Sequence, residues 1–311
     1  MGAMQEHTVA ALVRLAEADP RVVVITADLC QVLGLEPFRD RFPDRFFNLG
    51  IAEQNMMATA AGLALDGYVP YIATFAMYAT LRAGDQLRNG VALQNAKVRV
   101  IGSHCGISAG ENGASHQSLE DLAVARAIPN MTVLSPAGGP EAGALIEQSL
   151  DWPGPVYVRL AKPSEAYGFG EEYRPRIGAA SVVREGTDAA ILSTGFLLDR
   201  AMAAAEALES EGLDTAVLNV HTVKPLDERA VLDAARSTGA LVTVEDHSVV
   251  GGLGGAVCEL VATRAPVPVE RVGVGDTFGE SGDYASLLAK YRLDVPDIAS
   301  AVRTAVKRKE G

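Results

Sequence analysis

One carboxylate stands at the head of an otherwise apolar stretch of the sequence. Glu53 opens the run EQNMMATAAGLAL, in which every residue from Met56 to Leu65 is apolar or small except Thr59. This composition predicts a helix that is packed on most of its sides. An acidic residue in the first turn of a helix usually does no more than complement the helix dipole. A buried carboxyl group must be paired or protonated, however, so Glu53 is a candidate for proton transfer.

A long polar loop carries two of the five histidines of the chain. Its sequence, IGSHCGISAGENGASHQSLED at residues 101–121, places His104 and His116 among glycines and serines, with Glu111 and Asn112 between them. A loop of this length after a strand is more often functional than decorative. Either histidine alone would often be structural, but the pair favours a site for polar ligands or proton transfer.

Three further side chains are candidate ligand contacts. Phe75 and Tyr78 lie three positions apart in TFAMYA, so they share one face if a helix has begun there. Such a pair is commonly part of a core, but in a chain with 5% aromatic residues it is also a candidate stacking platform. Arg159 follows an apolar run and is a candidate anion anchor, although an arginine there can equally form an ordinary salt bridge.

These residues lie at the ends of predicted strands, because β-branched runs alternate with alanine-rich amphipathic stretches. We expect strands at residues 21–28, 68–75, 97–104, 131–136 and 154–160, separated by helices at residues 7–19, 52–65, 81–94, 118–128 and 140–150. Nearly continuous apolar strands between helices are typical of a parallel sheet covered on both faces. Ligands bind at the carboxyl ends of such strands, so one crevice is expected to gather Phe75, His104 and Arg159.

The same pattern resumes after a break in composition. Residues 161–178 concentrate proline, glycine, tyrosine and charge without a period, as expected of a linker. Apolar strands then alternate with predicted helices at residues 199–211, 227–237 and 254–264. We therefore predict an α/β protein with two doubly wound, largely parallel domains, which occupy residues 1–162 and 181–311 on either side of a linker at residues 163–180.

Charge and cysteine content narrow the possible partners. The formal net charge of -12 leaves no basic face for a nucleic acid. No apolar run approaches the ~20 residues of a membrane span, and the N-terminus lacks the pattern of a signal peptide, so no membrane partner is expected. Cys30, Cys105 and Cys258 stand far apart, which predicts neither a disulfide framework nor a zinc site and favours the reducing cytoplasm.

Several motifs, taken in order along the chain, resemble the C-terminal half of a transketolase. They are NLGIAEQN, TFAMYA, SHCGISAGENGASHQSLEDLAVARAIPNMTVLSPA, GPVYVRLAKP, NVHTVKPLD and VEDHSVVGGLGGAV. The resemblance covers essentially the whole chain and implies a pyrimidine-binding domain followed by a transketolase C-terminal domain. Members of this family are transferases of carbohydrate metabolism that use thiamine diphosphate to move a two-carbon ketol unit from a ketose to an aldehyde.

The resemblance also gives the candidate residues roles. It implies that Glu53 contacts a ring nitrogen of thiamine diphosphate and shares a proton with it, which would explain an acid in an apolar helix. It implies that Phe75 and Tyr78 flank the pyrimidine ring of the cofactor. His104 and His116 would face hydroxyl groups of the donor and assist the proton movements.

Three positions bear on how the substrates are held. By the same matching, Arg159 would meet a sugar phosphate. The GEDG motif of the family reads GENG here, so Asn112 replaces an aspartate that contacts a donor hydroxyl and the charge is lost. A basic residue that helps to hold the acceptor phosphate is replaced by Gln5. These departures predict weaker recognition of a phosphorylated acceptor.

One part of the cofactor site is missing from the sequence. The family holds the diphosphate through Mg²⁺ or Ca²⁺, with a Gly-Asp-Gly turn and a downstream Asn as hard oxygen ligands. Gly-Asp occurs at residues 84, 275 and 282, and in no case does a glycine follow. The resemblance therefore implies a split transketolase in which an N-terminal subunit supplies the metal and diphosphate site. We expect this chain to bind no metal itself and to homodimerise within an α₂β₂ assembly.

Two other functions fit the same sequence features. The β subunit of a 2-oxo acid dehydrogenase E1 component has the same two domains and also lacks the diphosphate half, although GENGASHQSLEDLAV resembles transketolase more closely. A non-catalytic scaffolding or regulatory partner would keep the fold alone. The changes at Gln5 and Asn112 support that alternative weakly, whereas Glu53 and the two loop histidines argue against it.

Overall fold

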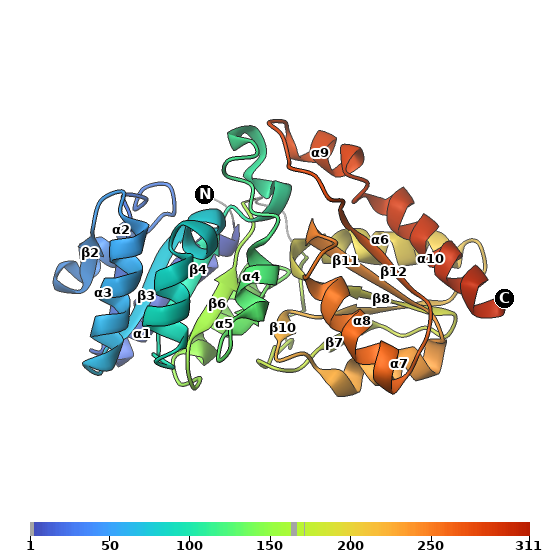
Figure 1. Cartoon of the computed structure of the whole chain (residues 1–311), viewed down its shortest axis with the longest axis horizontal. Coiled ribbons are helices and arrows are strands. Elements are labelled where there is room, and N and C mark those ends of the chain that lie inside the picture. Colours follow the sequence, from blue (N-terminus) through green and yellow to red (C-terminus); the bar gives the residue numbers. More distant parts are fainter. Residues whose placement is uncertain (1–2, 163–166, 171) are drawn as a thin grey trace.

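The computed structural model describes residues 3–162, 167–170 and 172–311. Two sheets lie side by side, each flanked by helices, and the C-terminal helix runs along the outer edge of the second half (Figure 1). The predicted linker at residues 163–180 falls partly outside the described residues. Among the described residues, no helix is both long enough and apolar enough to cross a bilayer.

The first sheet has seven strands and is parallel except at one edge. Its order is β10-β5-β6-β4-β3-β1-β2, with the antiparallel pair at β10 and β5. The strands are β1 (Val22–Thr26), β2 (Phe46–Asn48), β3 (Val69–Phe75), β4 (Arg99–Ser103), β5 (Thr132–Leu134), β6 (Val156–Arg159) and β10 (Thr222–Lys224). Neighbouring β3 and β4 are in a register that sets Phe75 opposite Ser103, so the carboxyl ends of these two strands meet.

Helices cover both faces of the first sheet. One face packs against α1 (Ala3–Ala18) and α5 (Gly139–Ser149), and the other against α3 (Glu53–Leu65) and α4 (Asp121–Ala127). The short helix α2 (Glu36–Arg41) follows β1. Burial on both faces explains why the strands read as nearly continuous apolar runs.

The second sheet has five strands and the same layered plan. Its order is β12-β11-β8-β9-β7, and only β7 is antiparallel to its neighbour. The strands are β7 (Ser181–Arg184), β8 (Ala189–Ser193), β9 (Thr215–Asn219), β11 (Leu241–Ser248) and β12 (Val269–Val274). The helices are α6 (Leu198–Glu209), α7 (Glu228–Thr238), α8 (Leu253–Arg264), α9 (Tyr284–Lys290) and α10 (Val295–Glu310). The predicted class, α/β with two largely parallel, doubly wound sheets, is confirmed.

Two details depart from the sequence-based expectation. The predicted helix at residues 81–94 is wound as two π-helical segments, η2 (Tyr78–Arg82) and η3 (Gln86–Ala92). Along this stretch the buried residues Ala79, Ala83, Leu87 and Val91 repeat every four positions, which is wider than the 3.6 residues of an α-helical turn; Ala83 lies between the two segments. Strand β10 belongs to the predicted second domain by sequence but extends the first sheet, because it pairs with β5.

Candidate active site

Glu53 is buried at the first position of α3, and an arginine compensates its charge. The side chain is 2% exposed, and Met56, Met57 and Ala60 of the same helix are also buried. Arg82 Nη1 donates to Oε1 and Oε2 of Glu53, at 3.1 Å each. The carboxyl group of Glu53 is therefore paired, one of the two states that burial allows.

Arg82 also connects Glu53 to the aromatic pair. It ends the π-helical segment η2, and its guanidinium lies over the ring of Tyr78, 3.9 Å from the centroid. The rings of Phe75 and Tyr78 are 5.8 Å apart and inclined by 29°, so they do lie on one face as the spacing predicts. Phe75 is nearly buried, whereas Tyr78 is partly exposed. The π-helical winding, frequent at functional sites, begins at Tyr78 itself.

Both loop histidines lie against this pair. The ring of His104 is 4.4 Å from that of Phe75, because β4 ends beside β3. His116 Nε2 lies 2.9 Å from the hydroxyl of Tyr78, and its ring centroid is 5.9 Å from that of Phe75. A continuous series of contacts thus runs from Glu53 through Arg82 and Tyr78 to His116.

His104 is held as a neutral imidazole. It is 6% exposed, and burial lowers its pKa to about 4, helped by the positive charge of Lys162 and by His116. Its Nδ1 lies 2.9 Å from Ser103 Oγ, and its backbone takes a left-handed φ of 55°. Such a conformation in a non-glycine residue is strained and is often found at functional sites. An uncharged ring can donate or accept a hydrogen bond at pH 7.

Gln5 supports His104. Its side chain is 4% exposed, and its Nε2 donates to Ser103 Oγ and to the carbonyl of Ala161, at 3.2 Å each. Ser103 Oγ in turn contacts His104. At this position the sequence suggested only a lost phosphate ligand, whereas the structure shows a residue that orders the end of β4. Asn112, by contrast, is exposed at the end of the 3₁₀ segment η4 (Gly106–Asn112).

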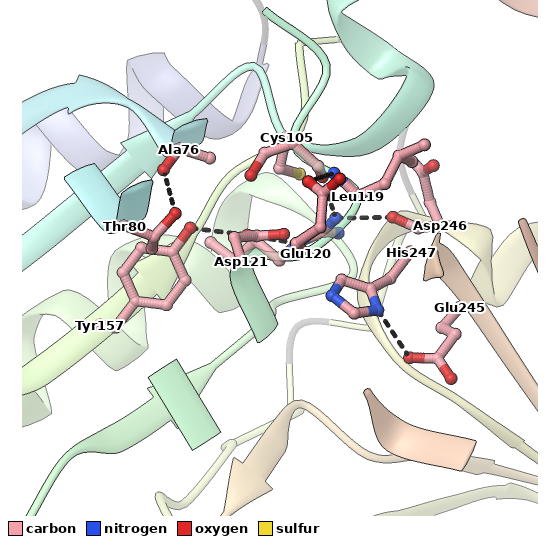
Figure 2. A network of polar contacts seen from close by, with 12 residues as sticks. Ala76, Thr80, Cys105, Leu119, Glu120, Asp121, Tyr157, Glu245, Asp246 and His247 are labelled. Carbon is pink, nitrogen blue, oxygen red and sulfur yellow. Dashed lines mark hydrogen bonds and ion pairs between the residues drawn. The ribbon is translucent and has the colours of Figure 1, made fainter. Parts of the chain in front are cut away.

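The structure corrects the prediction for Arg159. Its side chain is 2% exposed, and its Nε forms an ion pair of 2.8 Å with Asp121. Asp121 also accepts a hydrogen bond of 2.6 Å from the hydroxyl of Tyr157, and Figure 2 shows this second contact. Nη2 of Arg159 donates to the carbonyl of Asp246 at 2.6 Å. A guanidinium that is buried and already paired is not open to a sugar phosphate. Arg159 instead ties the end of β6 to α4 and to β11.

A different cation stands near the histidines. Lys162 is exposed, three residues beyond Arg159, and its charge acts on His104. The backbone N–H of Lys162 donates to Ser108 Oγ at 3.2 Å, which joins this end of the chain to the histidine-bearing loop. Arg159 ends the apolar run of β6 and stays buried within the sheet, whereas Lys162 lies beyond the end of the strand and is exposed.

Carboxylates do not cluster in the manner of a metal site. Within the ranges that the structure describes, no group of three or more His, Cys, Asp or Glu side chains is arranged to hold an ion. Asp28, at the carboxyl end of β1, instead interacts with Asn48, which donates to Asp28 Oδ1 at 3.1 Å.

Comparison with known proteins identifies both halves of the chain. Residues 3–165 match the model of the transketolase pyrimidine-binding domain, and residues 178–298 match that of the transketolase C-terminal domain. The 6-deoxy-6-sulfo-D-fructose transketolase subunit of a Clostridium species is 42% identical over 96% of this chain and 92% of that protein. A putative transketolase C-terminal section from Methanocaldococcus jannaschii is 39% identical over 96% of this chain and 94% of that protein.

A solved structure shows the same architecture. A split-gene transketolase, described as an inactive β₄ tetramer, superposes with a TM-score of 0.91 at 40% identity, over 98% of both chains. Rat transketolase is 37% identical over 96% of this chain, which corresponds to 48% of the rat protein. The chain therefore belongs to the transketolase family and corresponds to the C-terminal subunit of a split transketolase.

Proposed function

We propose that this chain is the β-type subunit of a thiamine-diphosphate-dependent split transketolase. In this proposal it transfers a two-carbon ketol unit from a ketose to an aldehyde and acts only with a partner subunit. The observation that carries the proposal is the series of contacts Glu53–Arg82–Tyr78–His116, with Phe75 and the neutral His104 beside it. A buried acid, an aromatic platform and two imidazoles are the groups that this chemistry requires.

The residues present fit the pyrimidine part of the cofactor. Glu53 offers a buried carboxylate to a ring nitrogen, and the inclined rings of Phe75 and Tyr78 offer apolar faces to an aromatic heterocycle. When bound, thiamine diphosphate supplies the carbon nucleophile that takes up the ketol unit. We assign the metal, Mg²⁺ or Ca²⁺, and the diphosphate to the N-terminal subunit, because the chain lacks a Gly-Asp-Gly sequence.

Each residue of the site has a distinct task in this proposal. Glu53 holds and returns a proton at the pyrimidine nitrogen, and Arg82 fixes the orientation of its two oxygens. His104 is neutral at pH 7, so it can hydrogen-bond a donor hydroxyl without repelling the cation of Lys162. His116 also lies against Phe75, with its ring centroid 5.9 Å from that of Phe75, and it assists proton movement at the substrate.

The surface next to Glu53 suits an interface with other subunits. Ile51 and Leu81 are exposed close in sequence to Glu53 and Arg82, and Leu65 and Leu93 are exposed at the C-terminal ends of α3 and η3, which pack against each other. Large apolar side chains exposed close together mark interaction sites. We infer that this face is covered in an α₂β₂ assembly, and the β₄ form of the related split-gene protein is consistent with self-association of such chains.

We propose that the donor is a ketose with an anionic group. Arg159 is committed to Asp121, so recognition of an anionic substrate tail would fall to exposed cations such as Lys162. The Clostridium relative is named for a sulfonated ketose, so an anionic group other than phosphate is a reasonable alternative. We also propose that the protein is located in the cytoplasm, because Cys30, Cys105 and Cys258 are unpaired thiols. We propose the same domain boundaries as the sequence suggests, with the first domain ending at residue 162 and the second beginning at residue 181.

Reconstitution tests the proposal. The chain is mixed with an N-terminal transketolase subunit from the same genome, thiamine diphosphate and Mg²⁺, and offered a ketose phosphate or 6-deoxy-6-sulfo-D-fructose with an aldose acceptor. We expect ketol transfer by the mixture and by neither subunit alone. Turnover of a 2-oxo acid with a lipoyl acceptor, and of no ketose, would instead identify a dehydrogenase subunit.

A matched pair of variants tests the role of Glu53. Glu53→Gln should abolish turnover while the two subunits still co-elute. Glu228→Gln is the control, because Glu228 also opens a helix but is exposed in the second half of the chain. Full activity of Glu53→Gln in the complex would contradict the proposed mechanism, and full activity of the chain alone would contradict the split site.

A further inference from the structure

The loop that carries both histidines has little regular structure of its own. This histidine loop (residues 104–120) contains the short 3₁₀ segment η4, which is broken by a kink at Gly110, where φ is 60° and ψ is −119°. Among the described residues, the side-chain hydrogen bonds and ring contacts of His116 are with Tyr78, Ser115 and Phe75. The position of His116 therefore depends on whatever holds the backbone of the loop.

The base and the exit of the histidine loop are held by β11 of the second sheet. Ile107 N donates to Asp246 Oδ1 at 2.9 Å, and Ser248 N donates to the carbonyl of Leu119 at 2.9 Å. Figure 2 shows Asp246 and His247 of this strand beside Leu119 and Glu120. Both ends of the loop are thus attached to the C-terminal half, in addition to the bonds that they form with the first half, such as that from Cys105 N to the carbonyl of Leu160 at 3.3 Å.

The tip of the histidine loop is held by a second segment of the C-terminal half. This brace segment (residues 275–283) links β12 to α9 and runs beside the loop (Figure 1). The buried amide of Gln117 joins the two, because its Nε2 donates to the carbonyl of Gly110 at 3.2 Å and to that of Glu280 at 2.8 Å. Gln117 directly follows His116.

Glycines allow the brace segment to approach so closely. A Cβ at Gly279 would lie 1.8 Å from Oε1 of Gln117, so any larger residue would force the amide to move. A Cβ at Gly113 would lie 2.5 Å from Ser281 Oγ. The backbone of the brace segment is therefore packed closely against the side-chain amide of Gln117. A single added methyl group at Gly279 would displace Gln117.

We propose that the brace segment positions the histidine loop and that Gln117 is the positioning residue that sets the place of His116 relative to Tyr78. Gln117 touches no substrate in this proposal and acts through the backbone that it holds. The inference rests on the proposed role of His116 as a donor contact. It gives the C-terminal half of the chain a task in the reaction, namely to fix the donor side of the site.

Hydrogen exchange in the full chain tests the brace without any assumption about activity. Gly279→Ala should raise amide exchange at residues 110–117 by about tenfold or more, because the added methyl group displaces Gln117. The matched control is Gly275→Ala, since a Cβ there meets nothing within 4 Å. Gln117→Met, which keeps the length but loses the amide, should reproduce the effect if Gly279→Ala does not fold. Equal amide exchange in the variants and the wild type would contradict the proposal that the brace segment holds the histidine loop.

Kinetics of the reconstituted complex then test the positioning role. Gln117→Met and Gly279→Ala should raise KM for the ketose donor by about tenfold, with a smaller change in kcat and an unchanged KM for thiamine diphosphate. A loss of kcat and of cofactor affinity together, or faster exchange without any change in donor KM, would overturn the positioning role. An inactive wild-type complex would count against the proposed function. The hydrogen-exchange result would still show whether the brace segment holds the histidine loop.

Discussion

Both carboxylate oxygens of Glu53 accept hydrogen bonds from one nitrogen of Arg82, at 3.1 Å each. The acid is 2% exposed, whereas the side chain of Arg82 is 42% exposed. The pair thus has a buried anion and a cation that water can reach. Removal of the cation leaves the carboxylate with a desolvation cost that nothing offsets, whereas removal of both charges costs less.

Arg82→Ala should therefore lower the free energy of unfolding, by on the order of 1–3 kcal/mol. The double variant Glu53→Gln/Arg82→Ala should lose less than the sum of the single variants. Urea unfolding measures all three. Arg88→Ala is the control, because Arg88 is exposed on the adjacent π-helical segment and should change stability by less than about 0.5 kcal/mol. Strictly additive losses would show that the two side chains do not depend on each other.

Tyr78→Phe separates the two contacts of Tyr78. The substitution keeps the ring between Phe75 and the guanidinium of Arg82 but removes the hydroxyl that lies 2.9 Å from His116 Nε2. We expect KM for the donor to rise severalfold, in line with the loss of one hydrogen bond of about 1 kcal/mol, while KM for thiamine diphosphate stays the same. Tyr68→Phe, at an exposed position, should change neither constant. A rise in cofactor KM would place the hydroxyl on the cofactor instead.

The sequence predicts the class of fold and the meeting of two candidate residues at neighbouring strand ends, for a physical reason. Strands buried on both faces leave long apolar runs, and parallel strands bring their carboxyl ends to one edge, so Phe75 and His104 could be expected to meet. Their ring separation of 4.4 Å follows from the register of β3 and β4. Register is a property of strand pairing, and a single strand does not reveal it.

The partners of these residues could not be predicted in the same way. Burial of Glu53 calls for a partner or a bound proton, but the sequence does not distinguish Arg82 from Arg88 as a cationic partner, since both lie in the predicted helix at residues 81–94. The π-helical winding decides between them, because Arg82 lies at the end of η2 and reaches Glu53. Gln117 gave no signal, because its partner Glu280 is 163 residues away in the chain.

Arg159→Met tests the correction made to that residue. Loss of the guanidinium leaves Asp121 buried without its cation, and such a change costs about 3–5 kcal/mol. Thermal or urea unfolding should show this loss, and Asp121→Asn in the same chain should recover part of it. The ratio of KM values for phosphorylated and unphosphorylated donors should stay constant at a temperature where the variant is folded. A selective loss for the phosphorylated donor would restore Arg159 as an anion ligand.

His104 should make the fold sensitive to acid. Its pKa is lowered to about 4 in the folded chain by burial, against about 6.5 for an unfolded histidine. Between these values the unfolded chain binds a proton that the folded chain does not, so stability is complete above pH 6.5 and falls as the pH drops toward 4. The contribution of this residue over that window is about 3 kcal/mol. Urea unfolding at a series of pH values measures it.

His104→Asn should reduce the loss of stability between pH 6.5 and pH 4, because asparagine tolerates the left-handed φ of 55° and does not titrate. Some acid sensitivity should persist, since burial also lowers the pKa of His221 to about 4. His7→Gln serves as the control, because His7 is exposed and its replacement should leave the dependence of stability on pH unchanged. NMR of the folded chain checks the same point directly: the Cε1 proton of His104 should not shift between pH 8 and pH 5.5. A titration centred near pH 6.5 would mean that water reaches the ring and that His104 can carry a charge at the site.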